Sequence, residues 1–213
     1  MFYDWFKRLT DFFGAFLLLI LFSPVIFVTC IAIKLTSSGP VFADTPKRVG
    51  KGGKLFYPYK FRSMVENAHK LMQTDPKFKK LYKKYQKGSF KSPEDDPRIT
   101  RVGSVIRRYS VDEVPQFLNV LKREMSIVGP RPYYPDELAF QQKRYPTTRE
   151  LVTETLKVKP GITGFWQVSG RSEINFDKRI EMDAYYARKR SALLDVLILL
   201  KTPFAMISGK GAV

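Results

Sequence analysis

The sequence predicts a helix-rich α+β protein that is held at one face of a membrane. Three observations support this class: an apolar run interrupted by a proline, a short aromatic segment with the alternation of a strand, and later stretches with helical spacing of apolar residues. The chain has 213 residues, of which 44% are hydrophobic, which suffices for one substantial core and one membrane segment. We therefore expect a membrane segment over residues 1–36 and a compact domain over residues 37–213.

The charge balance narrows the classes of partner. Lysine and arginine number 37 against 20 aspartates and glutamates, which gives a formal net charge of +17. Such a surplus predicts an anionic partner, which is a nucleic acid, an anionic membrane surface or a phosphorylated substrate. The single cysteine and single histidine, Cys30 and His69, exclude an intrachain disulfide, a thiolate metal cluster and a multi-histidine metal site.

The first element is the apolar run from Phe12 to Ile33, which contains no charged residue. About 20 helical residues cross the hydrocarbon core of a bilayer, so this run is long enough. Ser23 and Pro24 lie at its middle, where proline removes a backbone donor, and we expect the helix to break there. Because both flanks are basic, the positive-inside bias selects no orientation, and a re-entrant helix whose ends return to one face fits best. A straight span and a signal peptide are the alternatives.

The next elements are an extended segment and a lysine-rich helix. Leu55–Arg62 has the alternation and aromatic content of a short strand, which would present Lys60 and Arg62 on one side. Residues 63–86 have a helical pattern. From Lys70 to Lys91 there are eight lysines against one acid, which indicates either a solvated helix or contact with anionic lipid headgroups.

An acid pair, Asp112 and Glu113, lies in the most basic part of the chain. Residues 98–131 carry seven arginines and lysines against three acids, so we expect neighbouring cations to lower the pKa of a carboxylate there. Ser110 and Glu113 also match a capping box, in which both side chains bind the first amides of a helix. Pro115 instead favours a helix that begins at the proline itself, with both acids just ahead of it. The residues alone leave catalysis and helix capping as equal alternatives.

Several motifs in order along the chain resemble those of the bacterial sugar transferase family, the monotopic polyprenyl-phosphate phosphoglycosyl transferases. They are Lys7-Arg8-x-x-Asp11, Ser23-Pro24, Tyr59–Met64, Asp96–Gly103, Ser110–Gln116, Met125–Pro132, Lys159–Arg171 and Gly209–Ala212. The resemblance covers essentially the whole chain. It is strongest to members that transfer a hexose-1-phosphate to undecaprenyl phosphate.

The resemblance implies a reaction. A sugar-1-phosphate would pass from a UDP-sugar, either UDP-galactose or UDP-glucose, to undecaprenyl phosphate with release of UMP, as the first membrane step of surface polysaccharide assembly. It implies that Asp112 is the nucleophile of a phosphosugar-aspartyl intermediate and that Glu113 completes the catalytic dyad. It also implies Mg²⁺ as cofactor, with Asp112 and Glu113 as its protein ligands.

A set of basic and polar side chains is predicted to bind the substrate: Lys60, Arg62, Arg107, Arg131, Gln167 and Arg171. Arginine suits this role because its planar fork binds phosphate in two places. The glycines of the Pro160–Arg171 segment would let the backbone approach the nucleotide or form a tight connecting loop. Leu193–Leu200 has the pattern of an interfacial helix or of a buried core helix.

The resemblance also implies a location at the bacterial cytoplasmic (inner) membrane, with the catalytic domain on the cytoplasmic face and anionic membrane lipids as partners. A membrane-tethered nucleic-acid-binding protein is the alternative that the charge suggests. The sequence has no helix-turn-helix, zinc-finger or single-strand-binding motif, so we expect no nucleic-acid partner. A homo-oligomer is compatible with the sequence.

Overall fold

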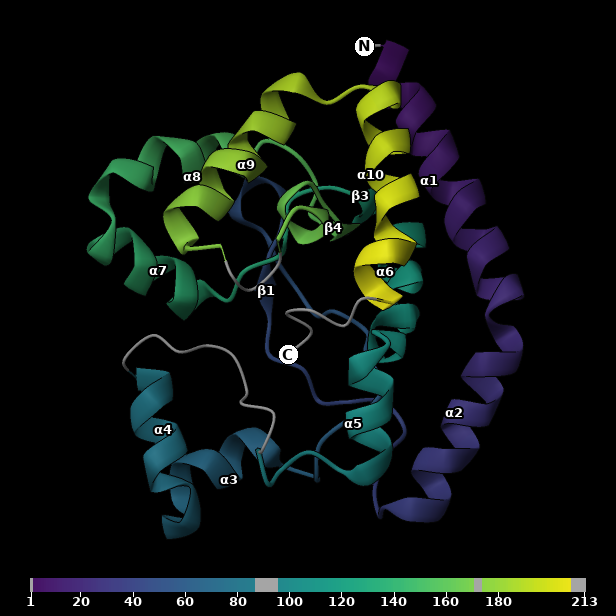
Figure 1. Cartoon of the computed structure of the whole chain (residues 1–213), viewed down its shortest axis with the longest axis vertical. Coiled ribbons are helices and arrows are strands. Elements are labelled where there is room, and N and C mark those ends of the chain that lie inside the picture. Colours follow the sequence, from purple (N-terminus) through teal and green to yellow (C-terminus); the bar gives the residue numbers. More distant parts are fainter. Residues whose placement is uncertain (1, 87–95, 171–173, 208–213) are drawn as a thin grey trace.

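The computed structural model describes residues 2–86, 96–170 and 174–207. Its α-helices are α1 (Phe2–Leu21), α2 (Ser23–Thr36), α3 (Ala68–Thr74), α4 (Lys79–Gln86), α5 (Arg101–Arg108), α6 (Phe117–Leu121), α7 (Pro135–Arg144), α8 (Arg149–Thr155), α9 (Phe176–Lys189) and α10 (Ala192–Ile207). Its strands are β1 (Arg48–Val49), β2 (Leu55–Phe56), β3 (Ser126–Val128) and β4 (Gly161–Thr163). Short 3₁₀ segments are η1 (Lys51–Gly53), η2 (Pro76–Phe78), η3 (Val111–Gln116), η4 (Pro146–Thr148) and η5 (Trp166–Val168). The predicted helix-rich α+β class is confirmed for these residues (Figure 1).

The strands form two short pairs that bring distant segments together. β1 and β2 are antiparallel, with Arg48 opposite Phe56, and β3 and β4 are parallel, with Ser126 opposite Gly161. A Cβ atom on Gly161 would lie 2.1 Å from the backbone nitrogen of Gly129, so only glycine permits this approach. In the described residues, Gly161 therefore serves the close contact of two chain segments, as a tight connection requires.

The apolar N-terminal run is a bent pair of helices. α1 and α2 meet at an angle of 58°. Pro24 lies in the first turn of α2, where a backbone N–H would have no partner within the helix, so proline is tolerated there. The predicted break at Ser23 and Pro24 is therefore confirmed. Within the described ranges, none of the helices taken singly has both the length and the apolar character to cross a bilayer, whereas the bent pair taken together meets both criteria.

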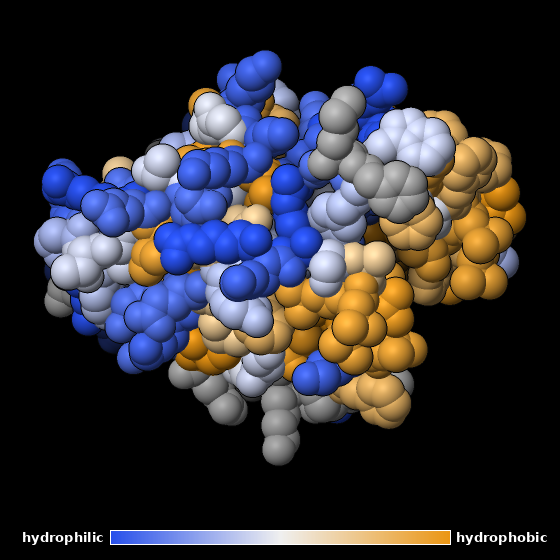
Figure 2. All heavy atoms as spheres, turned by 90° about the horizontal axis from the view of Figure 1, so that it is seen from above, coloured by the Kyte–Doolittle hydropathy of each residue, from blue (hydrophilic) through white to orange (hydrophobic). Residues whose placement is uncertain are grey.

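Large apolar side chains are exposed on α1, α2 and α10. α10 runs alongside α1, and the apolar surface gathers at the right of the molecule, where α1 and α2 lie (Figures 1 and 2). The most exposed of these side chains include Trp5, Phe13, Leu17, Leu21, Phe27, Val28, Leu193, Leu200 and Phe204. A patch of this kind marks contact with a membrane or with another protein. On α10 only one face is buried, through Ile198, so a helix buried in the core is the wrong alternative for 193–200.

The first turns of α1 are bonded to the rest of the molecule. Lys7 Nζ lies 2.7 Å from Asp195 Oδ2 on α10, and Tyr3 donates to the same oxygen at 2.9 Å. Asp11 is buried and accepts a hydrogen bond of 2.6 Å from Ser126 Oγ on β3. These polar contacts fix the start of the bent helix pair against α10 and β3.

The middle of α1 belongs to the core that supports the acid pair. Ala15 is fully buried in a cluster with Phe56, Val114, Phe117 and Val120. Two of these residues, Val114 and Phe117, lie one and four residues after Glu113 in the chain. α1 and the segment of the acids thus share one core. The division into residues 1–36 and 37–213 stays a prediction.

The lysine-rich region forms two short helices instead of one. α3 and α4 are separated at Asp75, whose side chain accepts a hydrogen bond from the backbone nitrogen of Lys77 at 2.9 Å. α4 lies on the opposite side of the molecule from α1 and α2 (Figure 1). Lys77, Lys79, Lys80 and Lys83 are exposed. The choice between a solvated helix and headgroup contact stays open, and residues 87–91 of the stretch lie outside the described ranges.

Candidate active site

Asp112 and Glu113 lie in the first turn of η3, which continues directly into α6. Ser110, which precedes η3, has a left-handed backbone with φ of 55° and forms no side-chain cap. The predicted capping box is therefore wrong. The helix does not begin at Pro115 either, because that residue lies inside η3. Both carboxylates are consequently available for other partners.

Lys60 contacts both acids. Its Nζ atom lies 2.5 Å from Glu113 Oε1 and 3.8 Å from Asp112 Oδ2. The backbone nitrogen of Phe61 donates to the carbonyl oxygen of Asp112 at 2.9 Å, which aligns the two segments. The structure thus brings the predicted binding residue Lys60 to the predicted dyad.

Asn119 on α6 fixes the segment that carries Lys60. Its side chain is fully buried, accepts a hydrogen bond of 2.8 Å from the nitrogen of Tyr59 and donates one of 2.8 Å to the carbonyl of Tyr57. Its amide also donates to Glu124 Oε2 at 2.7 Å. The sequence analysis missed this residue. The available signal was an amide inside an otherwise apolar helical stretch, since a buried amide there needs polar partners.

A pocket opens beside Glu113. It is lined by Arg48, Pro58, Lys60, Glu113, Gln116, Arg131, Pro132, Gly161, Ile162 and Gln167. Three residues predicted to bind substrate, Lys60, Arg131 and Gln167, are therefore assembled around one of the two acids. The lining also includes Arg48, which lies in none of the motifs, and Gln116, which lies in the Ser110–Gln116 motif but was not predicted to bind substrate.

Burial has the largest effect on the pKa of Asp112. The residue is only 8% exposed. Burial raises the pKa of Asp112 to about 6, with a further upward contribution from Glu113, although Lys60 and Arg107 act in the opposite direction. The predicted lowering of the pKa is therefore wrong for Asp112, because the loss of hydration outweighs the attraction of the cations.

Neighbouring cations together outweigh burial in setting the pKa of Glu113. Burial by itself would raise the pKa of Glu113, but Lys60, Arg131 and Arg48 together lower it to about 2. The predicted lowering of the pKa is confirmed for this acid. Glu113 stays ionised at neutral pH, and the ion pair of 2.5 Å with Lys60 explains why.

Two further predicted residues form the pocket wall. Arg131 is held between Pro130 and Pro132 after β3, and its guanidinium lies 5.9 Å from the centre of the Trp166 ring. Gln167 donates to the carbonyl of Ile162 at 3.1 Å, while its buried Oε1 has no partner within the described ranges. Arg131 thus supplies a positive charge, and Gln167 supplies a free acceptor for a donor group of a ligand.

The remaining predicted binding residues are not in this pocket. Arg62 is buried and donates to the carbonyl oxygens of Ser37 and Ser38, so it fixes the chain after α2 and does not face the same partner as Lys60. Arg107 on α5 contributes its charge at Asp112. Arg171 lies outside the described residues.

The dyad supplies two adjacent carboxylates for a divalent cation. The described residues contain no group of three or more His, Cys, Asp or Glu side chains that could hold a metal ion. Mg²⁺ is usually held by one or two carboxylates together with water and substrate phosphates. Asp112 and Glu113 fit a cation that arrives with a phosphorylated substrate.

The chain was compared with models of known protein families. The family model described as bacterial sugar transferase matches residues 2–209. The chain belongs to the bacterial sugar transferase family.

Individual relatives are similar over nearly the whole chain. The chain is 38% identical over 207 residues to the exopolysaccharide production protein ExoY of Sinorhizobium fredii, covering 97% of this chain and 87% of that protein. It is 40% identical over 210 residues to the undecaprenyl-phosphate galactose phosphotransferase of Salmonella typhimurium, and 40% identical over 212 residues to the UDP-glucose:undecaprenyl-phosphate glucose-1-phosphate transferase of Escherichia coli. These matches cover 97% of this chain but 41% of each of those two proteins.

Proposed function

We propose that the protein transfers a hexose-1-phosphate from a UDP-sugar to undecaprenyl phosphate and releases UMP. The main supporting observation is the buried Asp112 and the half-buried Glu113 beside a pocket that Glu113 lines together with Arg48, Lys60 and Arg131. The names of the relatives support undecaprenyl phosphate as acceptor and galactose or glucose as the sugar. The reaction would begin the assembly of a surface polysaccharide.

The proposed chemistry has two steps. In the first, a carboxylate oxygen of Asp112 attacks the sugar-linked phosphorus of the UDP-sugar, and the bond from that phosphorus to the bridging oxygen breaks, so that UMP leaves with the electron pair. In the second, a phosphate oxygen of undecaprenyl phosphate attacks the same phosphorus and releases the Asp112 carboxylate. Lys60 and Arg107 reduce the repulsion between the carboxylate and the phosphate.

Glu113 has a different part in this proposal. Its negative charge is stabilised by Lys60 and by the pocket arginines. The ion pair with Glu113 in turn keeps Lys60 close to the attacking oxygen of Asp112. Mg²⁺ would neutralise the diphosphate charge when bound, with Asp112 and Glu113 as its protein ligands.

We also propose that α1 and α2 enter and leave one face of the inner membrane, with the catalytic domain in the cytoplasm. Support comes from both ends of the bent pair, because Lys7 is bonded to Asp195 and the chain after α2 is bonded to Arg62 of the same body. The exposed apolar residues of α1, α2 and α10 would contact lipid, including anionic lipid beside the basic flanks. Single cysteines at positions 3 and 44, in a chain without Cys30, should label from the same side. Labelling from opposite sides would refute this topology.

The decisive experiment for the function is UMP release from a panel of UDP-sugars. The full-length protein in detergent should release many UMP molecules per enzyme from UDP-galactose or UDP-glucose only when undecaprenyl phosphate and Mg²⁺ are both present. Absence of release with every sugar would contradict the proposal. Salt-sensitive binding of DNA or RNA in that case would favour the nucleic-acid alternative.

A further inference from the structure

We propose that Arg48 is a substrate-binding residue that holds the α-phosphate of the nucleotide, the phosphate that departs with UMP. This inference deepens the proposed transfer and rests on it. The part of the pocket next to Glu113 would then hold the leaving group, and the transferred phosphate would lie near Lys60, whose Nζ is 3.8 Å from Asp112 Oδ2.

The geometry of Arg48 is that of a fixed side chain with donors to spare. The residue is 7% exposed, lies in β1 and lines the pocket with Lys60 and Arg131. Its Nη1 donates to the carbonyl of Pro132 at 3.1 Å, and its Cζ lies 3.2 Å from the centre of the Tyr134 ring. Within the described ranges this is its only hydrogen bond, so Nε and Nη2 remain available for a ligand. A guanidinium stacked on a ring and fixed at one end presents a preformed fork to a phosphate.

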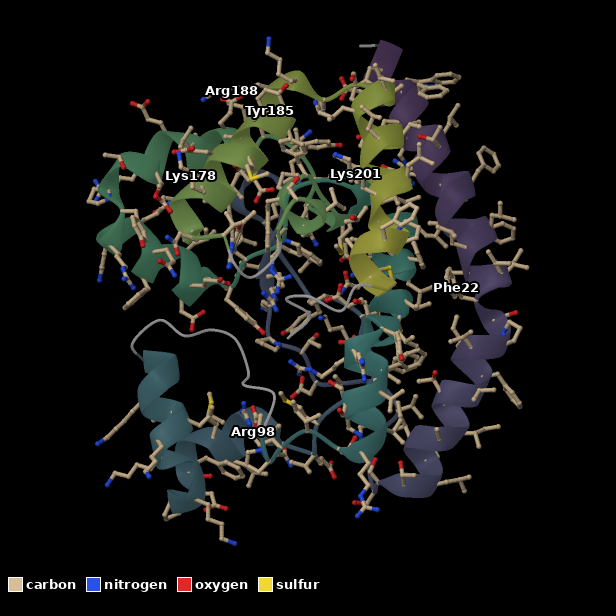
Figure 3. All side chains as sticks on the ribbon, in the orientation of Figure 1. Phe22, Arg98, Lys178, Tyr185, Arg188 and Lys201 are labelled. Carbon is tan, nitrogen blue, oxygen red and sulfur yellow. The ribbon has the colours of Figure 1, made fainter. Side chains whose placement is uncertain are left out.

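Arg98 is a second buried arginine, and its hydrogen-bond partners can be compared with those of Arg48. Arg98 is 4% exposed, and its Nε and Nη2 donate to the carboxylate of Asp96 at 2.9 and 2.6 Å. Its Nη1 donates to the carbonyl of Ala68, the first residue of α3, at 3.1 Å (Figure 3). Arg98 does not line the pocket. Arg48 has no ion pair of this length in the described part of the chain. Glu113 and Glu137 act on Arg48 only from outside ion-pair contact. Because burial of a charge without a close counter-ion is costly, the position of Arg48 in the pocket wall indicates an anionic ligand.

The two acids give the orientation of that ligand. Lys60 Nζ lies 3.8 Å from Asp112 Oδ2, whereas Arg48 and Arg131 line the pocket together with Glu113. Attack by Asp112 puts the transferred phosphorus near Lys60, and the leaving oxygen must lie roughly opposite the attacking one. The α-phosphate is one bridging oxygen away and gains negative charge as it departs. Arg48 and Arg131 stand where that charge develops.

The test uses full-length wild-type protein, Arg48→Gln, Arg48→Lys and, as a matched control, Arg98→Lys. Calorimetry measures the binding of UMP and of uridine, which lacks the phosphate. We expect Arg48→Gln to weaken UMP binding at least tenfold and to leave uridine binding unchanged. Arg48→Lys should give an intermediate loss because it keeps the charge without the fork. Arg98→Lys should bind UMP as the wild type does.

Turnover measurements separate the two phosphates that the enzyme meets. Arg48→Gln should lower kcat/KM for the UDP-sugar and leave the KM for undecaprenyl phosphate unchanged. A change confined to the KM for undecaprenyl phosphate would overturn the assignment to the nucleotide. So would UMP affinity within twofold of wild type, or an equal loss for UMP and uridine, which would make Arg48 a purely structural residue.

Two further arrangements keep the test decisive. If Arg48→Gln does not fold, Tyr134→Leu removes the stacking ring without altering the charge, and a UMP affinity equal to that of wild type would then count against the proposal. UMP binding needs no turnover. A wild-type protein that binds UMP through Arg48 but releases none from any UDP-sugar would therefore refute the transfer and not the binding role.

Discussion

Asp112 and Glu113 are adjacent in the chain, yet the two ends of the site that they form have opposite electrostatics. Burial raises the pKa of Asp112 to about 6, whereas Lys60, Arg131 and Arg48 overcome burial and lower the pKa of Glu113 to about 2. Lys60 contributes to the difference, because its Nζ lies 3.8 Å from Asp112 Oδ2 but 2.5 Å from Glu113 Oε1. A basic neighbourhood in sequence therefore does not fix the ionisation of each carboxylate in it.

The difference matches a division of labour. A carboxylate with a raised pKa is more basic, and it is still largely ionised at neutral pH, which suits the attacking group. A carboxylate with a lowered pKa keeps its charge at all physiological pH values, which suits a group that holds cations in place.

Asp112→Asn should abolish transfer, with a loss of at least about 10⁴-fold in kcat, because an amide cannot form the covalent intermediate. Incubation with a UDP-sugar carrying ³²P in the β-phosphate, without undecaprenyl phosphate, should label the wild-type protein and leave this variant unlabelled. Glu113→Gln should lose about 10²- to 10³-fold and still accept label slowly. If Asp112→Asn keeps near wild-type turnover, the nucleophile is misassigned.

Lys60→Met should reduce kcat about 10²-fold and shift its pH profile. Transfer by the wild type should decline as the pH falls through about 6, because Asp112 becomes protonated there. Lys60 lowers the pKa of Asp112, so its removal should move this decline to higher pH. Rate measurements between pH 5 and 8 would show the shift. An unchanged profile would mean that Lys60 acts on Glu113 alone.

Asn119→Ala should destabilise the protein by about 1–3 kcal/mol, because the buried backbone groups of Tyr57 and Tyr59 lose their partners. Lys60 follows directly after Tyr59, so kcat should also fall, while binding of UMP should change less. Chemical unfolding in detergent would give the free energy, and the same preparation would give the rates. A matched substitution of an exposed residue on the same helix, Leu118→Ala, should have the smaller effect on both.

Asp183 is another buried carboxylate, and in the described part of the chain no cation forms an ion pair with it. Burial raises the pKa of Asp183 to about 8, although hydrogen bonds from Tyr133 and Trp166 act in the opposite direction. Since the folded-state pKa is above the unfolded one, folding takes up a proton between about pH 4 and pH 8. Stability should therefore decrease as pH rises through this window, by at most about 1.4 kcal/mol per pH unit, and level off above it.

Asp183→Asn should remove this slope, because the amide has no proton to lose. The free energy of unfolding of both proteins, measured at several pH values from 5 to 9, gives the difference directly. Identical slopes for the variant and the wild type would show that other groups cause the pH dependence.

Local patterns were sufficient for several features of this protein. The break at Pro24 follows from the missing backbone donor of one residue, and the extended segment before Arg62 follows from its alternation. The acid pair and Lys60 were identifiable because they lie within motifs. The amphipathic character of α10 was one of two alternatives, and the exposure of Leu200 and Phe204 decided between them.

Residue patterns alone were enough to identify the family, the helix-rich class, the position of the helix break and the two acids. The three-dimensional arrangement was needed to show that Arg48 lines the pocket, that Asn119 fixes the segment of Lys60, and that Arg62 binds Ser37 and Ser38 instead of the pocket. It was also needed for the difference in pKa between Asp112 and Glu113. These properties depend on contacts between segments far apart in the chain. Burial and distances of a few ångströms set them, and the spacing of residues along the sequence contains neither.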